Sequence, residues 1–95
     1  MPDLDNKVIV LTGANGLLGR NFLRTLASQG AQIACIDKKF NEDLLAEFTS
    51  NENTKFYITD ITDDIQLSKC FGEINNHFGK IDGLVNNAAI NPKVE

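Results

Sequence analysis

Strand-like and helix-like segments alternate along this 95-residue sequence, and this alternation restricts the fold more than any other feature. Short apolar runs rich in β-branched residues predict strands at residues 7–12, 32–37, 54–60 and 81–86. Apolar residues at helical spacing predict helices at residues 17–29, 41–51 and 62–79. Strands that are separated by helices indicate a parallel sheet, because neighbouring parallel strands need a crossover connection.

The resulting order, β-α-β-α-β-α-β, predicts an α/β fold with a Rossmann-type parallel sheet. If the first two helices cover one face and the third covers the other, right-handed crossovers give the strand order 3-2-1-4. This is an incomplete doubly wound fold, with one mononucleotide-binding half and the strand after the switch point. In the first helix, the apolar stripe is expected at Leu18, Phe22 and Leu26, flanked by Leu23 and Ala27. Thr62 is expected to cap the third helix.

Composition and charge exclude several classes of partner. Nine scattered basic residues stand against 13 acidic ones, so nucleic acid is not an expected partner. No apolar run approaches the roughly 18 residues that span a membrane, and the acidic, polar start is unlike a signal peptide. Cys35 and Cys70 are isolated, which predicts buried thiols in a reducing compartment, the cytoplasm. His77 has no companions at ligand spacing, so no metal site is expected.

Three glycines stand at intervals of three between the first strand and the first helix: Gly13, Gly16 and Gly19. Gly13 can turn the chain sharply out of the strand, Gly16 leaves room for a pyrophosphate, and Gly19 lets the helix pack closely. The N–H groups at the helix start would face that pyrophosphate. A tight turn without a ligand is the alternative, and the spacing is one residue longer than the common G-x-G-x-x-G.

The second predicted strand ends at Asp37, 24 residues beyond Gly13. An acid at about this distance binds the ribose hydroxyls of adenosine in dinucleotide folds, and a surface-turn aspartate is the alternative. A carboxylate beside a 2′-phosphate costs about 4 kcal/mol at a separation of about 4 Å in a moderate dielectric. Exposed lysines such as Lys38 or Lys39 return only about 0–1 kcal/mol. We therefore expect NAD as the cofactor, in preference to NADP.

Two more segments end strands at the same edge of the sheet. Asp60-Ile61 can contact adenine, through a carboxylate that accepts from its amino group and a backbone N–H that reaches a ring nitrogen. Alternatively, Asp60 only caps the following helix. The sequence Asn86-Asn87-Ala88-Ala89 ends the fourth strand with small residues that let a ribose approach. Its two amides either contact the cofactor or tie neighbouring strands together.

These elements resemble the short-chain dehydrogenase/reductase family over residues 7 to about 90. Four motifs match in order: the glycine turn preceded by Thr12, the strand-end Asp37, Asp60-Ile61-Thr62, and GKIDGLVNNAA at residues 79–89. The resemblance implies that residues 13–18 hold the pyrophosphate, Asp37 the adenosine ribose, Asp60-Ile61 the adenine, and Asn87 with Ala88 the ribose beside the nicotinamide. The predicted cofactor-binding set comprises Gly13, Asn15, Gly16, Leu17, Leu18, Gly19, Asp37, Asp60, Ile61, Asn87 and Ala88.

The family's catalytic Ser and Tyr-x-x-x-Lys have no counterpart here. Tyr57, the only tyrosine, lies in a predicted strand and is followed four residues later by Ile61. No catalytic residue is therefore predicted within the chain. The glycine spacing is commoner in the family's extended, sugar-nucleotide branch, whereas Asn-Asn-Ala-Ala is typical of its compact branch, so both branches stay open.

Residues 1–95 are accordingly expected to be the N-terminal NAD(P)-binding Rossmann segment of a longer oxidoreductase. By resemblance, that enzyme transfers hydride between nicotinamide and an alcohol or ketone, and this chain alone is inactive. One alternative is a non-catalytic dinucleotide-binding redox sensor or regulator. Another is a sugar-nucleotide epimerase or dehydratase. The longer protein would bind a small-molecule substrate, and its assembly as a homo-oligomer stays open.

Overall fold

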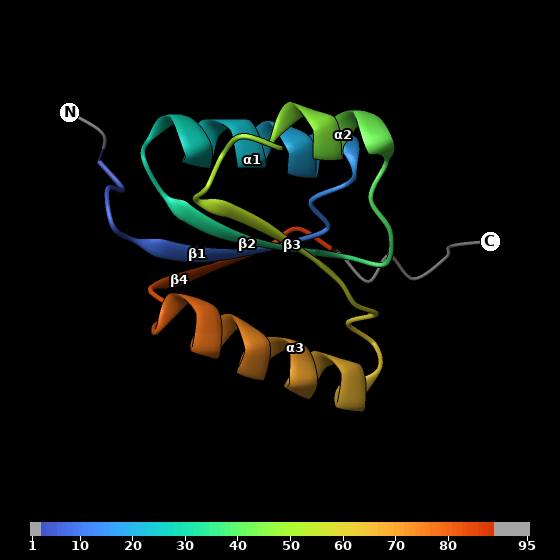
Figure 1. Ribbon diagram of the computed structural model, residues 1–95. Helices are drawn as coiled ribbons and strands as arrows, with labels where there is room; N and C mark the ends of the chain where they lie inside the picture. Colours follow the sequence, from blue (N-terminus) through green and yellow to red (C-terminus); the bar gives the residue numbers. More distant parts are fainter. Residues whose placement is uncertain (1–2, 89–95) are drawn as a thin grey trace.

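A four-stranded parallel sheet lies between two layers of helices (Figure 1). The computed structural model describes residues 3–88. In chain order the elements are β1 (Val8–Thr12), α1 (Leu17–Ser28), β2 (Gln32–Asp37), α2 (Glu42–Glu47), β3 (Thr54–Ile58), α3 (Asp64–Phe78) and β4 (Gly83–Asn86). The strand order is β3-β2-β1-β4, which confirms the predicted topology. No helix within residues 3–88 is long and apolar enough to cross a membrane.

Each face of the sheet has its own apolar core. In Figure 1, α1 and α2 cover one face and α3 covers the other. Because side chains alternate along a strand, Leu11 of β1 packs toward α1 and α2, whereas Val10 packs toward α3. Both thiols are buried, Cys35 in the first core and Cys70 in the second, and neither forms a disulfide. All five residues of β1 are buried, as a central parallel strand requires.

The buried stripe of α1 differs from the predicted one. The flanking Leu23 is fully buried and Leu26 packs partly against the core, as the pattern indicates. Leu18 and Phe22, however, are 59% and 38% exposed, so their place in the buried stripe was wrong. The cause is Gly19, which brings the helix so close to the turn that a Cβ there would overlap the Gly13 carbonyl. This contact turns Gly19 and Leu23 toward the sheet. The helix ends as predicted, with Gly30 in the left-handed region at φ 86°.

Side-chain bonds set the ends of the elements that the sequence placed inaccurately. Asp63, not Thr62, caps α3, because its carboxylate accepts from the Ile65 and Gln66 N–H groups. β3 stops before Asp60, whose N–H donates to the Gln66 side chain at 3.0 Å instead of to a strand. β4 begins only at Gly83, after Asp82 has bonded Val8 through its own N–H and its carboxylate. α2 is the shorter helix 42–47 within the predicted 41–51.

Candidate functional site

The glycine turn between β1 and α1 is held by contacts to the end of β2 and to the residues that follow β4. The Gly13 N–H donates to the Ile36 carbonyl at the end of β2 at 2.8 Å. The Gly13 carbonyl accepts from Gly16 N–H at 3.3 Å and from Asn87 Nδ2, beyond β4, at 3.2 Å. Gly13 has φ 71°, and a Cβ there would lie 2.9 Å from the Ala88 nitrogen. Gly13 and Gly19 are therefore required by the fold itself.

Gly16 differs, because nothing in the described protein requires a glycine there. Its φ is −72°, which any residue adopts, and an added Cβ would have its nearest neighbour, the Gly13 oxygen, at 3.6 Å. Gly16 also precedes the helix as an N-cap without a capping side chain. Among residues 3–88, no acceptor takes the N–H groups of Leu17, Leu18 and Gly19. A phosphate group fits this corner, because it would accept from bare N–H groups at the positive end of α1.

Asp37 lies beside this turn, as the sequence predicts. Its Oδ2 accepts from the Asn15 N–H at 3.0 Å and its Oδ1 from the Lys38 N–H at 2.7 Å. These two bonds fix the direction of the carboxylate at the end of β2. Each oxygen keeps a lone pair that could accept from a ribose hydroxyl.

Asp60 and Ile61 lie at the end of the neighbouring strand. Asp60 Oδ1 accepts from the Thr62 N–H and Oγ1 groups, and these bonds lower the pKa of Asp60 below its usual range. Since Asp63 provides the helix cap, the alternative role of Asp60 as a cap was wrong. Ile61 packs partly against the core under α3. Asp60 therefore stays ionised at neutral pH beside the edge of the sheet.

The amides of Asn86, at the end of β4, and Asn87, just after it, tie strands together, which was one of their two predicted roles. Asn86 Oδ1 accepts from Thr12 Oγ1 at 2.9 Å, and Asn87 donates to the Gly13 carbonyl. Thr12 Oγ1 in turn accepts from the Ala88 N–H at 3.1 Å, so Ala88 is held against the glycine turn. The second alanine of the motif, Ala89, lies outside the described residues.

Three residues shape the site without a role that the sequence predicted: Thr12, which was noted only as part of the glycine motif, and Arg20 and Asn41. Thr12 joins β1 to the segment after β4, while Arg20 and Asn41 both bond Asn15. Thr12 could have been found from its place directly before Gly13. Nothing in the sequence separates Arg20 from Arg24, the other basic residue of α1, because the role of Arg20 depends on where α2 lies.

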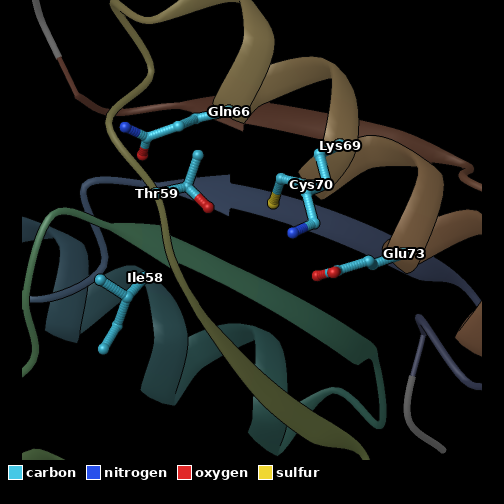
Figure 2. A pocket seen from close by; sticks show the side chains of 6 residues that line it. All are labelled: Ile58, Thr59, Gln66, Lys69, Cys70 and Glu73. Carbon is cyan, nitrogen blue, oxygen red and sulfur yellow. The ribbon is translucent and has the colours of Figure 1, made fainter.

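A cavity of about 290 Å³ lies between β3 and α3 (Figure 2). It adjoins Asp60, whose N–H donates to the lining residue Gln66. Its lining comprises Ile58, Thr59, Gln66, Lys69, Cys70 and Glu73. Burial raises the pKa of the Cys70 thiol, and a hydrogen bond with Thr59 opposes this only in part. The thiol is thus protonated at neutral pH, which makes it a poor nucleophile or metal ligand.

Tyr57 is unsuited to acid–base chemistry. It is only 7% exposed, in the core under α3, and burial raises its pKa to about 12. A proton-transfer tyrosine needs the opposite shift, toward the working pH. Among residues 3–88 there is also no group of three or more His, Cys, Asp or Glu side chains that could hold a metal ion.

Known proteins match this chain closely. The family model for short chain dehydrogenases matches residues 7–95. The 15-hydroxyprostaglandin dehydrogenase [NAD(+)] of Bos taurus is 36% identical over 93 residues, which cover 93% of this chain and 35% of that enzyme. The chain thus spans about a third of the length of the curated relatives it matches.

Solved structures share the fold. An NAD+-bound xylitol dehydrogenase superposes with a TM-score of 0.75 at 28% identity, covering 86% of this chain and 33% of that one. The structure of ElxO with NADP bound gives a TM-score of 0.75 at 27% identity, covering 85% of this chain and 34% of that one. Matching structures therefore include both NAD and NADP complexes.

Proposed function

Because the chain belongs to the short-chain dehydrogenase family, we propose that it is the N-terminal, NAD-binding segment of a longer oxidoreductase. The observation that carries this proposal is the corner at Gly16. Three N–H groups at the start of α1 have no acceptor within residues 3–88, and Gly16, which directly precedes them, carries no Cβ that would obstruct a ligand. A pyrophosphate would accept from these groups, while Asp37 would accept from the adenosine ribose and Asp60-Ile61 would contact the adenine.

NAD is the proposed cofactor, in preference to NADP. Asp37 is fixed by the Asn15 and Lys38 N–H groups, so it cannot easily turn away from a 2′-phosphate. Lys38 and Lys39 are exposed and would offset little of the resulting repulsion. The relatedness to a dehydrogenase named for NAD(+) supports the same choice.

The proposed reaction is hydride transfer between the nicotinamide and an alcohol or ketone of a small-molecule substrate. The nicotinamide supplies hydride chemistry when it is bound, and residues of this chain bind and orient the dinucleotide. Asn87 and Ala88 would lie against the nicotinamide-side ribose, close to the glycine turn that they contact. The proton-transfer groups are proposed to lie in sequence beyond this chain. The proposed location is the cytoplasm, where Cys35 and Cys70 stay reduced.

Substituting Gly16 by Ala tests the cofactor site directly. In the full-length protein that carries this chain, we expect NAD to bind at least about tenfold more weakly, because the new methyl group occupies the space of the pyrophosphate. The unfolding midpoint should stay close to that of the wild type, since a Cβ at residue 16 meets no protein atom closer than 3.6 Å. Isothermal titration with NAD and thermal unfolding measure the two effects.

Gly72→Ala is the matched control, because it adds the same methyl group at an exposed site in α3 with no neighbour within 4 Å. This control should stabilise the protein by about 0.5–1 kcal/mol and leave NAD binding unchanged. Equal NAD affinity in the Gly16→Ala variant and the wild type would refute the proposed site.

A further inference from the structure

Asn15, in the glycine turn, is held on every polar group it has. Its N–H donates to Asp37 Oδ2 at 3.0 Å, and its carbonyl accepts from Arg20 Nε at 2.9 Å. Its side-chain oxygen accepts from the Asn41 N–H at 2.8 Å and from Arg20 Nη2 at 3.4 Å. Its side-chain Nδ2 faces Asn41 Oδ1 at 3.5 Å. The residue therefore joins the glycine turn, α1 and the start of α2.

Arg20 is unusual among the arginines of α1 because its side chain is only 15% exposed. Besides Asn15, it contacts Asp43 on α2, where Arg20 Nη1 donates to Asp43 Oδ2 at 2.9 Å. Arg24 makes the corresponding bridge one turn later, to Glu47 at 2.7 Å, but its side chain is 46% exposed and touches neither the turn nor Asn15. A guanidinium is rarely buried without a full set of acceptors, and here Asn15 supplies two of the three.

Asn41 supports the same arrangement. It stands at the N-cap of α2, where an asparagine side chain usually accepts from the first turn of its own helix. Here the side chain makes no such bond and faces the Asn15 amide instead. The start of α2 is thus built onto the glycine turn, which explains why Asn41 and Arg20 converge on one residue.

We propose that Arg20 is a positioning residue for the adenosine half of the dinucleotide, acting through Asn15 on the Asp37 carboxylate. Arg20 holds the Asn15 peptide from its carbonyl side, and that peptide directs its N–H to Asp37. The carboxylate then presents its remaining lone pairs in one fixed direction. This inference rests on the proposed NAD site and adds a residue that need not touch the cofactor.

The structure predicts a selective effect. Loss of the Arg20 contacts frees Asn15 and, with it, Asp37, which is proposed to bind the adenosine ribose. Affinity for the adenosine half should fall, while affinity for the nicotinamide half, which would lie toward Asn87 and Ala88, should persist. Discrimination against NADP should fall too, because a freed Asp37 could turn away from a 2′-phosphate. A purely structural role would weaken all ligands alike.

The experiment compares Arg20→Gln with Arg24→Gln in the full-length protein that carries this chain. Both variants remove one positive charge and one ion pair between α1 and α2, but only the first releases Asn15. Dissociation constants are measured for NAD, NADP, 5′-AMP and nicotinamide mononucleotide, at a temperature where circular dichroism shows both variants folded. Arg20→Lys, which keeps the charge but not the fork geometry, provides a second variant if Arg20→Gln does not fold.

We expect Arg20→Gln to weaken the binding of NAD and of 5′-AMP about tenfold and to reduce the preference for NAD over NADP. The affinity for nicotinamide mononucleotide should change less than about twofold. Arg24→Gln should bind all four ligands with the affinities of the wild type. Arg20→Lys should bind 5′-AMP as weakly as Arg20→Gln does. Equal 5′-AMP affinity in the Arg20→Gln and Arg24→Gln variants would overturn the positioning role alone. A wild-type protein that binds neither NAD nor 5′-AMP would overturn the proposed function as well.

Discussion

Each of the three glycines of the turn is a glycine for a different physical reason. Gly13 needs a positive φ and close contact with Ala88, and Gly19 needs close contact with the Gly13 carbonyl. Gly16 has neither a positive φ nor a close contact, so no contact of the described residues requires a glycine at this position. For Gly13 and Gly19 the sequence predicted a sharp turn and close packing of the helix, because both residues lie between a strand and a helix. The ligand remains a proposal that the open corner supports.

Asp37 is where cofactor choice should be decided. Substituting Asp37 by Ala removes the carboxylate that would accept from the ribose and repel a 2′-phosphate. We expect NAD affinity to fall about tenfold and NADP affinity to rise, so that the NAD-to-NADP ratio changes by a factor of about 100 or more. Parallel titrations of the full-length protein with the two cofactors measure the ratio.

Asp64→Asn is the control for this change, since it removes an equal charge from an exposed position in the first turn of α3, on the other face of the sheet. It should leave the ratio of the two cofactors as in the wild type. An unaltered ratio in the Asp37→Ala protein would show that another group selects the cofactor.

The sequence did not reveal residues whose roles depend on side-chain contacts between positions that are far apart along the chain. Arg20 and Asp43 are 23 positions apart, and Asn15 and Asn41 are 26 apart. Hydrophobic spacing reports which face of a helix is apolar, but it carries no information on which polar side chains meet across two helices. The third helix shows the same limit locally, because Thr62 and Asp63 are both good capping residues and only the backbone geometry selects Asp63.

At the scale of elements, the hydrophobic period predicted the type and order of all seven elements within residues 3–88. The strand order followed from crossover handedness together with the assumption that the first two helices cover one face and the third the other. The errors lie at the ends, where single hydrogen bonds decide. Asp82 shows the physical reason: its carboxylate, 2.8 Å from the Val8 nitrogen, takes the N–H that a further strand residue would have bonded. Such a bond joins residues 74 positions apart and leaves no trace in the local pattern.

The Asp82 contact predicts an acid-sensitive connection between β1 and the start of β4. The hydrogen bond from the Val8 N–H lowers the pKa of the Asp82 carboxyl in the folded state. Lys80, whose Nζ lies 3.1 Å from Asp82 Oδ2, lowers it further but by less. The unfolded chain therefore binds a proton more readily near the ordinary aspartate pKa of about 3.9. The stabilisation is present above that pH and is lost as the pH falls through the lower, folded value.

Asp82→Asn tests this connection. The variant should be less stable than the wild type at neutral pH, and it should lose less stability between about pH 5 and about pH 3. Urea unfolding midpoints across that range measure both effects. Lys80→Gln removes only the weaker partner and should keep most of the acid sensitivity. A larger change in Lys80→Gln than in Asp82→Asn would contradict the assignment to the Val8 bond.

At the scale of the whole molecule, large apolar side chains remain exposed on both sides of the sheet. Leu17 and Leu18 at the start of α1 are 83% and 59% exposed, Ile65 on α3 is 82% exposed, and Leu84 on the outer strand β4 is 56% exposed. Exposed apolar surface of this kind fits the proposal that further sequence of a longer protein packs against this segment. That proposal also accounts for the absence of the family's Tyr-x-x-x-Lys pattern from residues 1–95.

The central claim is that a dinucleotide pyrophosphate rests against the backbone where β1 passes into α1. The most direct measurement is an NAD titration of the full-length protein followed by backbone amide resonances. We expect the largest shifts on the amides of Gly16, Leu17, Leu18 and Gly19, and we expect ADP to produce most of the same shifts. If NAD binds while these four amides stay unchanged and the largest shifts fall elsewhere, such as around the cavity between β3 and α3, the claim is contradicted.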